Sequence, residues 1–304
     1  MEFTPKQQEV RRWLERRQGI LLAHNYQPGE IQDVADFLGD SLALSMTAAK
    51  TAARVIVFCG VHFMAETAAI LCPDKTVLLP LEDVGCYMAA TITPEQLRAR
   101  KAELPGVPVV TYVNSTAAVK AESDICCTSA NVVPVVNSLT PDRVLMVPDR
   151  NLALYTARRT RKQVLYWEGC CNVHDGLSAP QVQACQAAHP AAVFIAHPEC
   201  RPEVLDLAQV VSSTSGMLQY VRESDQQEFI IGTEMGIIHT LHKENPEKIF
   251  YSPSSDLVCP DMKRITLEDV IAALKENRHQ ITVPEDVRRR ALLAVERMLA
   301  VPRD

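Results

Sequence analysis

Short apolar runs alternate along this chain with longer segments that are rich in alanine. Ile20–Ala23 and Val55–Cys59 are apolar throughout. Continuous runs of this kind are typical of parallel strands that are buried on both faces. The segments Ala43–Ala53 and Phe63–Leu71 predict helices between such strands. The pattern therefore predicts an α/β fold of alternating strands and helices with right-handed crossovers.

The same order of elements recurs three times at a nearly constant interval. The predicted third strands begin at Val55, Val144 and Phe229, which lie 89 and 85 residues apart. Two sets of polar residues recur at intervals of 88 and 85: His24, Tyr112 and His197 at the ends of first strands, and Ser41, Ser129 and Thr214 further on. A repeat at one long interval indicates repeated structural units. The sequence thus predicts three copies of one unit, each with a four-stranded parallel sheet.

One cysteine occupies the same place in every copy, after the fourth strand. The predicted fourth strands are Thr76–Leu79, Gln163–Tyr166 and Lys248–Tyr251. The cysteines that follow them are Cys86, Cys171 and Cys259, at intervals of 85 and 88 residues. Each cysteine lies seven residues before a predicted helix N-cap, at Thr93, Ser178 and Thr266.

The repeat divides the chain into five segments. They are an N-terminal helix (1–19), repeat 1 (20–105), repeat 2 (106–191), repeat 3 (192–280) and a C-terminal helix (281–304), with the terminal helices on the outside. Ligands of parallel sheets bind at the carboxyl ends of the strands, where the recurring polar residues fall. Pseudo-threefold symmetry would bring these ends together. We therefore expect three three-layer α/β/α domains around one central cavity.

The composition excludes some classes of protein and is consistent with the predicted fold. The chain has 304 residues, of which 47% are hydrophobic, and a net charge of −6, so a broad nucleic-acid-binding surface is not expected. The start is polar, and no apolar run approaches the roughly 20 residues that span a bilayer. We therefore expect a cytoplasmic protein without a membrane contact. Its ten cysteines are then expected to be thiols, most of them small buried residues such as Cys59.

Three cysteines that converge on one axis indicate a metal site. Zinc bound by three cysteines and a histidine or water is one interpretation. An iron–sulfur cluster with one open iron, able to act as a Lewis acid, is another, and three structural cysteines are the third.

The other recurring residues suit the binding of anions and the transfer of protons. Hydroxyls near helix N-termini can hold carboxylates or phosphate, and a plain helix cap is the alternative role for each of them. Glu199 is a candidate general acid or base, or else a surface carboxylate. Tyr26 and Tyr112 could donate hydrogen bonds or close the cavity.

At these residues the chain resembles the quinolinate synthase family over nearly its whole length. The motifs that carry the resemblance are Ala23-His24-Asn25-Tyr26, Gly39-Asp40-Ser41, Tyr112-Val113-Asn114-Ser115, Thr128-Ser129-Ala130-Asn131, Trp167-Glu168-Gly169-Cys170-Cys171-Asn172-Val173-His174, His197-Pro198-Glu199-Cys200, Ser213-Thr214-Ser215-Gly216 and Cys259-Pro260-Asp261-Met262. The resemblance implies three pseudo-symmetric α/β domains around one [4Fe–4S] cluster. It also implies that iminoaspartate condenses with dihydroxyacetone phosphate to quinolinate, with loss of phosphate and two waters, and that aspartate oxidase supplies the iminoaspartate.

The resemblance implies a role for each matching residue. The cluster ligands would be Cys86, Cys171 and Cys259. The residues expected to bind substrate are His24, Ser41, Tyr112, Val113, Asn114, Ser129, His197, Pro198, Glu199, Ser213 and Thr214. Those expected to act in catalysis are Tyr26, Tyr112, His197 and Glu199, with Tyr26 in a closing segment and Glu199 moving protons.

The chain departs from the family pattern in three places. A second thiol, Cys170, precedes the expected ligand, and Asp261 stands where asparagine is common. The C-terminus lacks a Cys-x-x-Cys pair that some members carry, so no thiol redox switch is expected there. Two alternative functions stay open from the residues alone: another iron–sulfur hydro-lyase, or a non-catalytic scaffold stabilised by zinc.

The spacing to the helix cap distinguishes the two neighbouring thiols. Only Cys171 keeps the seven-residue interval, so Cys171→Ser should lose the bound cluster and Cys170→Ser should keep it. Iron and sulfide counted in anaerobically purified variants will check this, and the reverse result would assign the ligand to Cys170.

Overall fold

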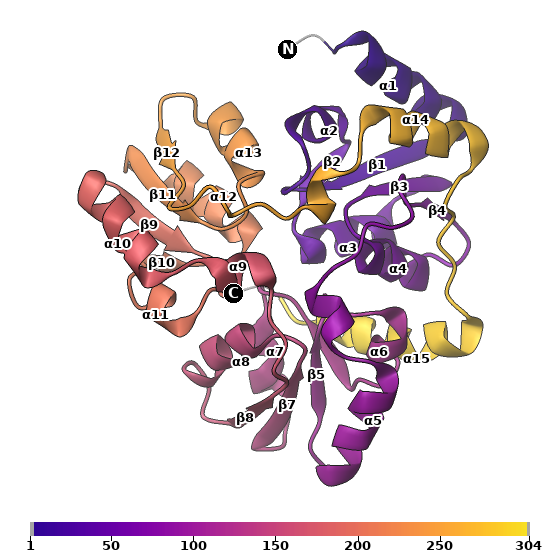
Figure 1. Ribbon diagram of the computed structural model, residues 1–304. Helices are drawn as coiled ribbons and strands as arrows, with labels where there is room; N and C mark the ends of the chain where they lie inside the picture. Colours follow the sequence, from indigo (N-terminus) through magenta and orange to yellow (C-terminus); the bar gives the residue numbers. More distant parts are fainter. Residues whose placement is uncertain (1–2, 303–304) are drawn as a thin grey trace.

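The computed structural model describes residues 3–302 as three similar α/β units (Figure 1). Each unit contains one four-stranded sheet whose strands pair in parallel. In chain order within a unit, the strands lie in the order 2-1-3-4 in all three sheets. The predicted fold class, three similar α/β/α units, is therefore confirmed.

The strands lie close to the predicted apolar runs. They are β1 (Gly19–His24), β2 (Phe37–Gly39), β3 (Val55–Cys59), β4 (Thr76–Leu78), β5 (Val109–Tyr112), β6 (Ile125–Cys127), β7 (Arg143–Val147), β8 (Gln163–Tyr166), β9 (Val193–Ala196), β10 (Val210–Val211), β11 (Glu228–Gly232) and β12 (Ile249–Tyr251). The first and third strands of each unit are central and mostly buried, which explains why their sequences lack polar alternation.

Helices connect the strands and cover the sheets. They are α1 (Pro5–Arg17), α2 (Gly29–Val34), α3 (Ser41–Lys50), α4 (His62–Leu71), α5 (Pro94–Glu103), α6 (Ala117–Lys120), α7 (Val132–Ser138), α8 (Arg150–Ala157), α9 (Asn172–Gly176), α10 (Ala179–Ala188), α11 (Pro202–Leu205), α12 (Thr214–Glu223), α13 (Ile237–Glu244), α14 (Leu267–Glu276) and α15 (Glu285–Leu299), with short 3-10 helices at Met88–Thr91 and Asp261–Lys263. Within residues 3–302, no helix combines the length and apolar character that crossing a membrane requires.

Helix caps set most of the boundaries. Thr93, Ser178 and Thr266 each begin a helix with a complete capping box, as predicted. The helix expected over Ala43–Ala53 instead runs over Ser41–Lys50, because the Asp40 side chain accepts a hydrogen bond from the Ala43 amide and starts the helix earlier.

The helix after each cysteine packs against the following unit. Leu97 of α5 is fully buried in a cluster with Val109 and Leu145, which belong to the second sheet. Likewise α10 contacts α11 of the third unit. The predicted domain boundaries at 105, 191 and 280 stay a prediction, and these contacts favour grouping each of these helices with the sheet that it covers.

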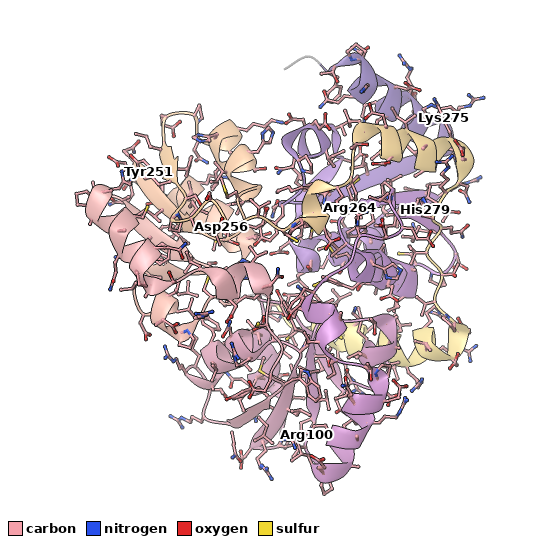
Figure 2. The ribbon with its side chains drawn as sticks, in the orientation of Figure 1. Arg100, Tyr251, Asp256, Arg264, Lys275 and His279 are labelled. Atoms are coloured by element: carbon pink, nitrogen blue, oxygen red, sulfur yellow. The ribbon has the colours of Figure 1, made fainter. Side chains whose placement is uncertain are left out.

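The third such helix, α14, closes the ring by returning to the first unit. It contacts α1 and β3, and the ammonium of Lys275 lies 2.7 Å from Glu9 Oε1 on α1 (Figure 2). Beyond α14, the chain pairs with the edge strand of the first sheet, where the Ile281 amide donates to Val77 O at 2.9 Å. The first helix, α1, and α14 therefore lie side by side (Figure 1).

The C-terminal helix α15 joins the first two units. It contacts α4 of the first unit and both α6 and β6 of the second. Its inner face is buried, and Asn131 Nδ2 donates to the carbonyl of Met298 at 3.2 Å.

Because Leu97 carries the contact between α5 and the second sheet, Leu97→Ala should lower the free energy of unfolding by about 2–5 kcal/mol. Leu293→Ala is the matched control, since Leu293 is 56% exposed and its truncation leaves no cavity. Urea denaturation followed by circular dichroism will compare the two variants, and equal midpoints would contradict the packing role of Leu97.

Candidate active site

A cavity of about 310 Å³ is lined by residues from all three units. Twelve of the fifteen predicted site residues line it: His24, Tyr26, Ser41, Cys86, Tyr112, Asn114, Ser129, Cys171, His197, Glu199, Thr214 and Cys259. Most of them follow directly from strand ends, since His24 and Tyr112 end β1 and β5, and His197 follows β9. The side chains therefore gather where the carboxyl ends of the strands meet.

The other three predicted residues support the wall and do not line the cavity. Val113 is buried, and its amide donates to the carbonyl of Cys127 at 2.9 Å. Pro198 is buried between two lining residues. Ser213 is the N-cap of α12, and its hydroxyl accepts from the Gly216 amide at 3.3 Å. Their assignment to substrate binding stays a prediction.

Two of the predicted hydroxyls lie at helix starts without being the caps. Asp40 and Ser213 cap α3 and α12, so Ser41 and Thr214 are the first helical residues. Their side chains line the cavity instead. A helix N-terminus carries a partial positive charge and free amides, so these two positions favour an anion in the cavity.

The three expected ligand thiols reach this cavity from three units. Cys86, Cys171 and Cys259 line it, whereas Cys170 does not. Burial raises the pKa of Cys86 to about 12 and also raises the pKa values of Cys171 and Cys259. Without a metal these thiols are neutral, and a metal ion would bind them as thiolates with release of protons.

A buried carboxylate holds the loop of the third cysteine. Glu234 Oε1 accepts a hydrogen bond from the Cys259 amide at 3.2 Å, and Glu234 Oε2 accepts one from the Gly236 amide at 2.7 Å. Lys263 Nζ lies 2.8 Å from Glu234 Oε1 and also donates to the carbonyl of Tyr26. Glu234 therefore ties the third cysteine to the Tyr26 segment of the first unit.

Asp149 occupies the equivalent position in the second unit, 85 residues before Glu234. It is buried, and its Oδ1 accepts a hydrogen bond from the Leu152 amide at 2.7 Å. Burial and the nearby Glu199 charge raise the pKa of Asp149, against the opposing effect of backbone amides that include Cys171. Sequence reasoning missed both acids, although the repeat interval itself marks them as equivalent.

Asp261, which departs from the family pattern, has a structural partner. Its Oδ1 accepts a hydrogen bond from the Gly85 amide at 3.2 Å, next to Cys86. Arg264 lies 3.6 Å from the same oxygen and balances its charge (Figure 2). Asp261 thus links the loops of the first and third cysteines.

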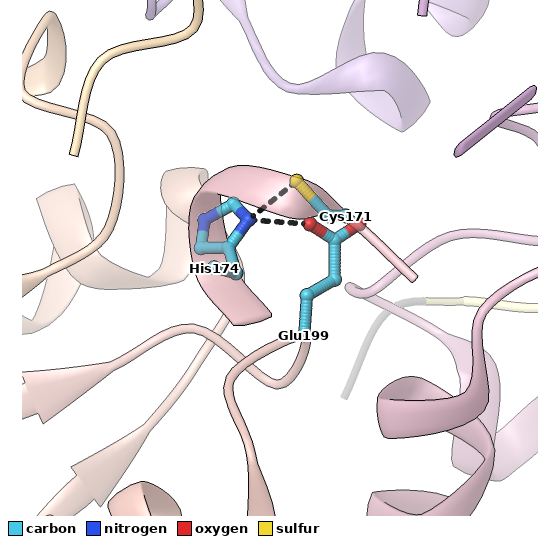
Figure 3. A group of neighbouring side chains, drawn as sticks. All are labelled: Cys171, His174 and Glu199. Atoms are coloured by element: carbon cyan, nitrogen blue, oxygen red, sulfur yellow. Dashed lines mark hydrogen bonds and ion pairs between the residues drawn. The ribbon is translucent and has the colours of Figure 1, made fainter. Parts of the chain in front are cut away.

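An acid and an imidazole lie beside the middle cysteine (Figure 3). His174 Nδ1 is 2.7 Å from Glu199 Oε2 and 3.2 Å from Cys171 Sγ. On its other side, His174 Nε2 is 2.8 Å from Thr233 Oγ1, which is 2.5 Å from the Tyr26 hydroxyl oxygen. His174 belongs to the motif that contains Cys171, but the sequence predicted no role for it. Nothing in the sequence pointed to Thr233.

Burial and pairing set the charges in the cavity. Burial alone would raise the pKa of Glu199, but interactions with His174, His197 and Tyr112 outweigh it and lower that pKa. Burial lowers the pKa of His24 to about 4 and that of His197 to about 3. At neutral pH the site therefore combines an ionised Glu199 with two neutral imidazoles.

Burial also raises the pKa values of Tyr26 and Tyr112, so both hydroxyls stay protonated and can donate hydrogen bonds. Neither lysine nor arginine belongs to the set of described residues that line the cavity. Neutral donors and helix N-termini are the protein groups that can hold an anionic ligand there.

Thiols from three units, an ionised acid and neutral hydrogen-bond donors in one cavity form the donor set of a candidate metal-binding active site. Residues 8–300 match the family described as Quinolinate synthetase A protein. The chain belongs to this quinolinate synthase family.

Several named relatives match the chain along nearly its whole length. The quinolinate synthase of Geobacter metallireducens is 56% identical over 304 residues, which cover 100% of both chains. That of Desulforudis audaxviator is 57% identical, with 99% of this chain and 98% of the relative covered. That of Methanoregula boonei is 56% identical, with 97% and 98% covered.

Removal of the Glu234 carboxylate should destabilise the protein, since two backbone amides and Lys263 would lose their partner. We expect Glu234→Ala to lower the free energy of unfolding by about 1–3 kcal/mol for each buried donor left unpaired. Glu247→Ala, a truncation at an exposed position, should change it by less than about 0.5 kcal/mol. Urea denaturation of both variants will show this, and similar midpoints would refute the holding role of Glu234.

Proposed function

We propose that this protein condenses iminoaspartate with dihydroxyacetone phosphate to form quinolinate, with release of phosphate and two waters. The observation that carries the proposal is the meeting of Cys86, Cys171 and Cys259 with Glu199 in one cavity. Membership of the quinolinate synthase family supports it. This membership also sets aside the alternative of a non-catalytic scaffold.

The donor atoms in the cavity fit an iron–sulfur cluster. Three thiols are the soft ligands that such clusters take, and Cys86, Cys171 and Cys259 would hold a [4Fe–4S] cluster. Two buried oxygens at the cavity, Asn114 Oδ1 and Glu199 Oε1, have no hydrogen-bond partner among residues 3–302. When bound, a cluster with three protein ligands supplies an open iron that polarises a substrate oxygen.

Neutral donors would bind the anionic groups of both substrates. Iminoaspartate carries two carboxylates, and dihydroxyacetone phosphate carries a phosphate. The hydroxyls of Ser41 and Thr214 lie at the starts of α3 and α12, and Ser129 lines the same cavity. Neutral His24 and His197 can each add one N–H donor. Because no lysine or arginine among residues 3–302 lines the cavity, the helix N-termini supply the favourable potential.

Glu199 would move the protons that the condensation requires. A base must be ionised to accept a proton, and the lowered pKa of Glu199 keeps it so at neutral pH. His174 orients the carboxylate through the 2.7 Å contact with Oε2. Tyr26 and Tyr112 keep their protons and can donate hydrogen bonds to oxygens that gain charge during the reaction.

The context of the reaction follows from the same chemistry. We place the protein in the cytoplasm, where a reducing environment keeps its cysteines available as thiols. An aspartate oxidase would supply the iminoaspartate.

Anaerobically purified protein should carry roughly four irons and four sulfides per chain and form quinolinate from the two substrates. His197→Ala should keep its iron but lose quinolinate formation by on the order of 100-fold or more, because a donor to substrate is removed. The matched control is His189→Ala, whose ring stacks on Tyr251 outside the cavity and whose loss should leave turnover unchanged.

Three results would each contradict a different part of the proposal. Iron-loaded protein that forms no quinolinate would refute the proposed reaction and favour another iron–sulfur hydro-lyase. Protein that stays free of iron after anaerobic reconstitution would refute the cluster. Normal turnover in His197→Ala would remove His197 from the substrate site.

A further inference from the structure

Cys171, His174 and Glu199 place three different metal-binding atoms together (Figure 3). The thiol sulfur, an imidazole nitrogen and a carboxylate oxygen all lie within 4.8 Å of one another. His174 lies on α9, about one turn after Cys171, while Glu199 lies in the loop after β9. Two elements that are distant in sequence therefore complete the group.

The donors match the preferences of zinc. Thiolate, imidazole and carboxylate are its ordinary ligands in proteins, at about 2.0–2.3 Å. A thiolate and a carboxylate together balance the charge of a divalent ion. All three residues line the cavity, so a fourth coordination position would face the space where ligands enter.

The surroundings already orient the imidazole and the carboxylate. His174 Nε2 lies 2.8 Å from Thr233 Oγ1, an outer contact of the kind that orients metal-binding histidines. The opposite nitrogen, Nδ1, then faces both Glu199 Oε2 and Cys171 Sγ. Glu199 is 3% exposed, and its second oxygen, Oε1, has no hydrogen-bond partner within residues 3–302.

We propose that Cys171, His174 and Glu199 bind one zinc ion when the protein holds no iron–sulfur cluster. The ion binds Nδ1, Oε2 and the Cys171 sulfur. The imidazole stays neutral with its proton on Nε2, which faces Thr233 Oγ1, and binding releases the thiol proton. Cys171 belongs to both sites, and zinc therefore excludes the cluster. The zinc site does not depend on the proposed reaction, whereas the predicted exclusion rests on the proposed cluster ligands.

A titration of iron-free, full-length protein with Co²⁺, followed by competition with Zn²⁺, tests the proposal. One ion per chain is expected, with the charge-transfer absorption of a single thiolate. Cys171→Ser, His174→Gln and Glu199→Gln should each weaken Zn²⁺ binding at least about tenfold, and Thr233→Val should weaken it by about tenfold through the lost outer contact. Circular dichroism will confirm that each variant is folded.

The other two cysteines serve as matched controls. Cys86→Ser and Cys259→Ser should leave the Zn²⁺ affinity unchanged, because neither belongs to the three-atom group. If these variants lose zinc, or if cobalt absorbs as a complex of three thiolates, the ion lies among the three cysteines and the proposal fails. Absence of zinc binding to the wild-type protein also overturns it.

A reconstitution experiment checks the predicted exclusion. Zinc-loaded protein should take up iron and sulfide only after a chelator removes the zinc, and equal uptake with and without zinc would contradict a shared Cys171. Quinolinate formation by iron-loaded protein is measured separately, so failure of the zinc site would leave the proposed function untouched.

Discussion

The return of α14 to the first sheet is the contact on which the shared cavity depends. The helix buries Leu267, Val270 and Leu274, and it contacts α1 and β3. The Cys259 loop lies just before this helix, so packing of α14 on the first unit brings the third cysteine toward the first. Asp261 and Lys263 then join that loop to Gly85 and to the Tyr26 segment. An open chain of three units would provide the same residues without one common cavity.

The burial of three carboxylic acids is the second constraint. Glu199, Asp149 and Glu234 are each almost fully buried, and a buried carboxylate is costly unless hydrogen bonds or opposite charges compensate it. Glu234 has two amides and Lys263. Glu199 has His174 and Tyr112, while its Oε1 faces no partner among the described residues. The site is therefore arranged to receive a cation or a hydrogen-bond donor next to Cys171.

The repeat made much of the site predictable. Residues at equivalent positions share an interval, so His24, Tyr112 and His197 could be aligned before any contact was known, and all three line the cavity. Asp149 and Glu234 also lie 85 residues apart, so the repeat could have paired them although neither belongs to a motif. The role of Thr233 could not be predicted from the sequence, because a threonine that follows an apolar strand forms no distinctive motif. Only its contact with His174 in the folded protein reveals the role.

The sequence by itself determined what is local to one unit. Strand burial, capping boxes and the order of elements follow from neighbours within a few residues, and the interval of the three cysteines repeats that local pattern. Tertiary structure alone decided how the units face one another: that Leu97 covers the second sheet, that α14 returns to the first, and that Glu199 meets His174. These contacts join one unit to another, so they are decided by the packing of whole units and not by the pattern within one unit.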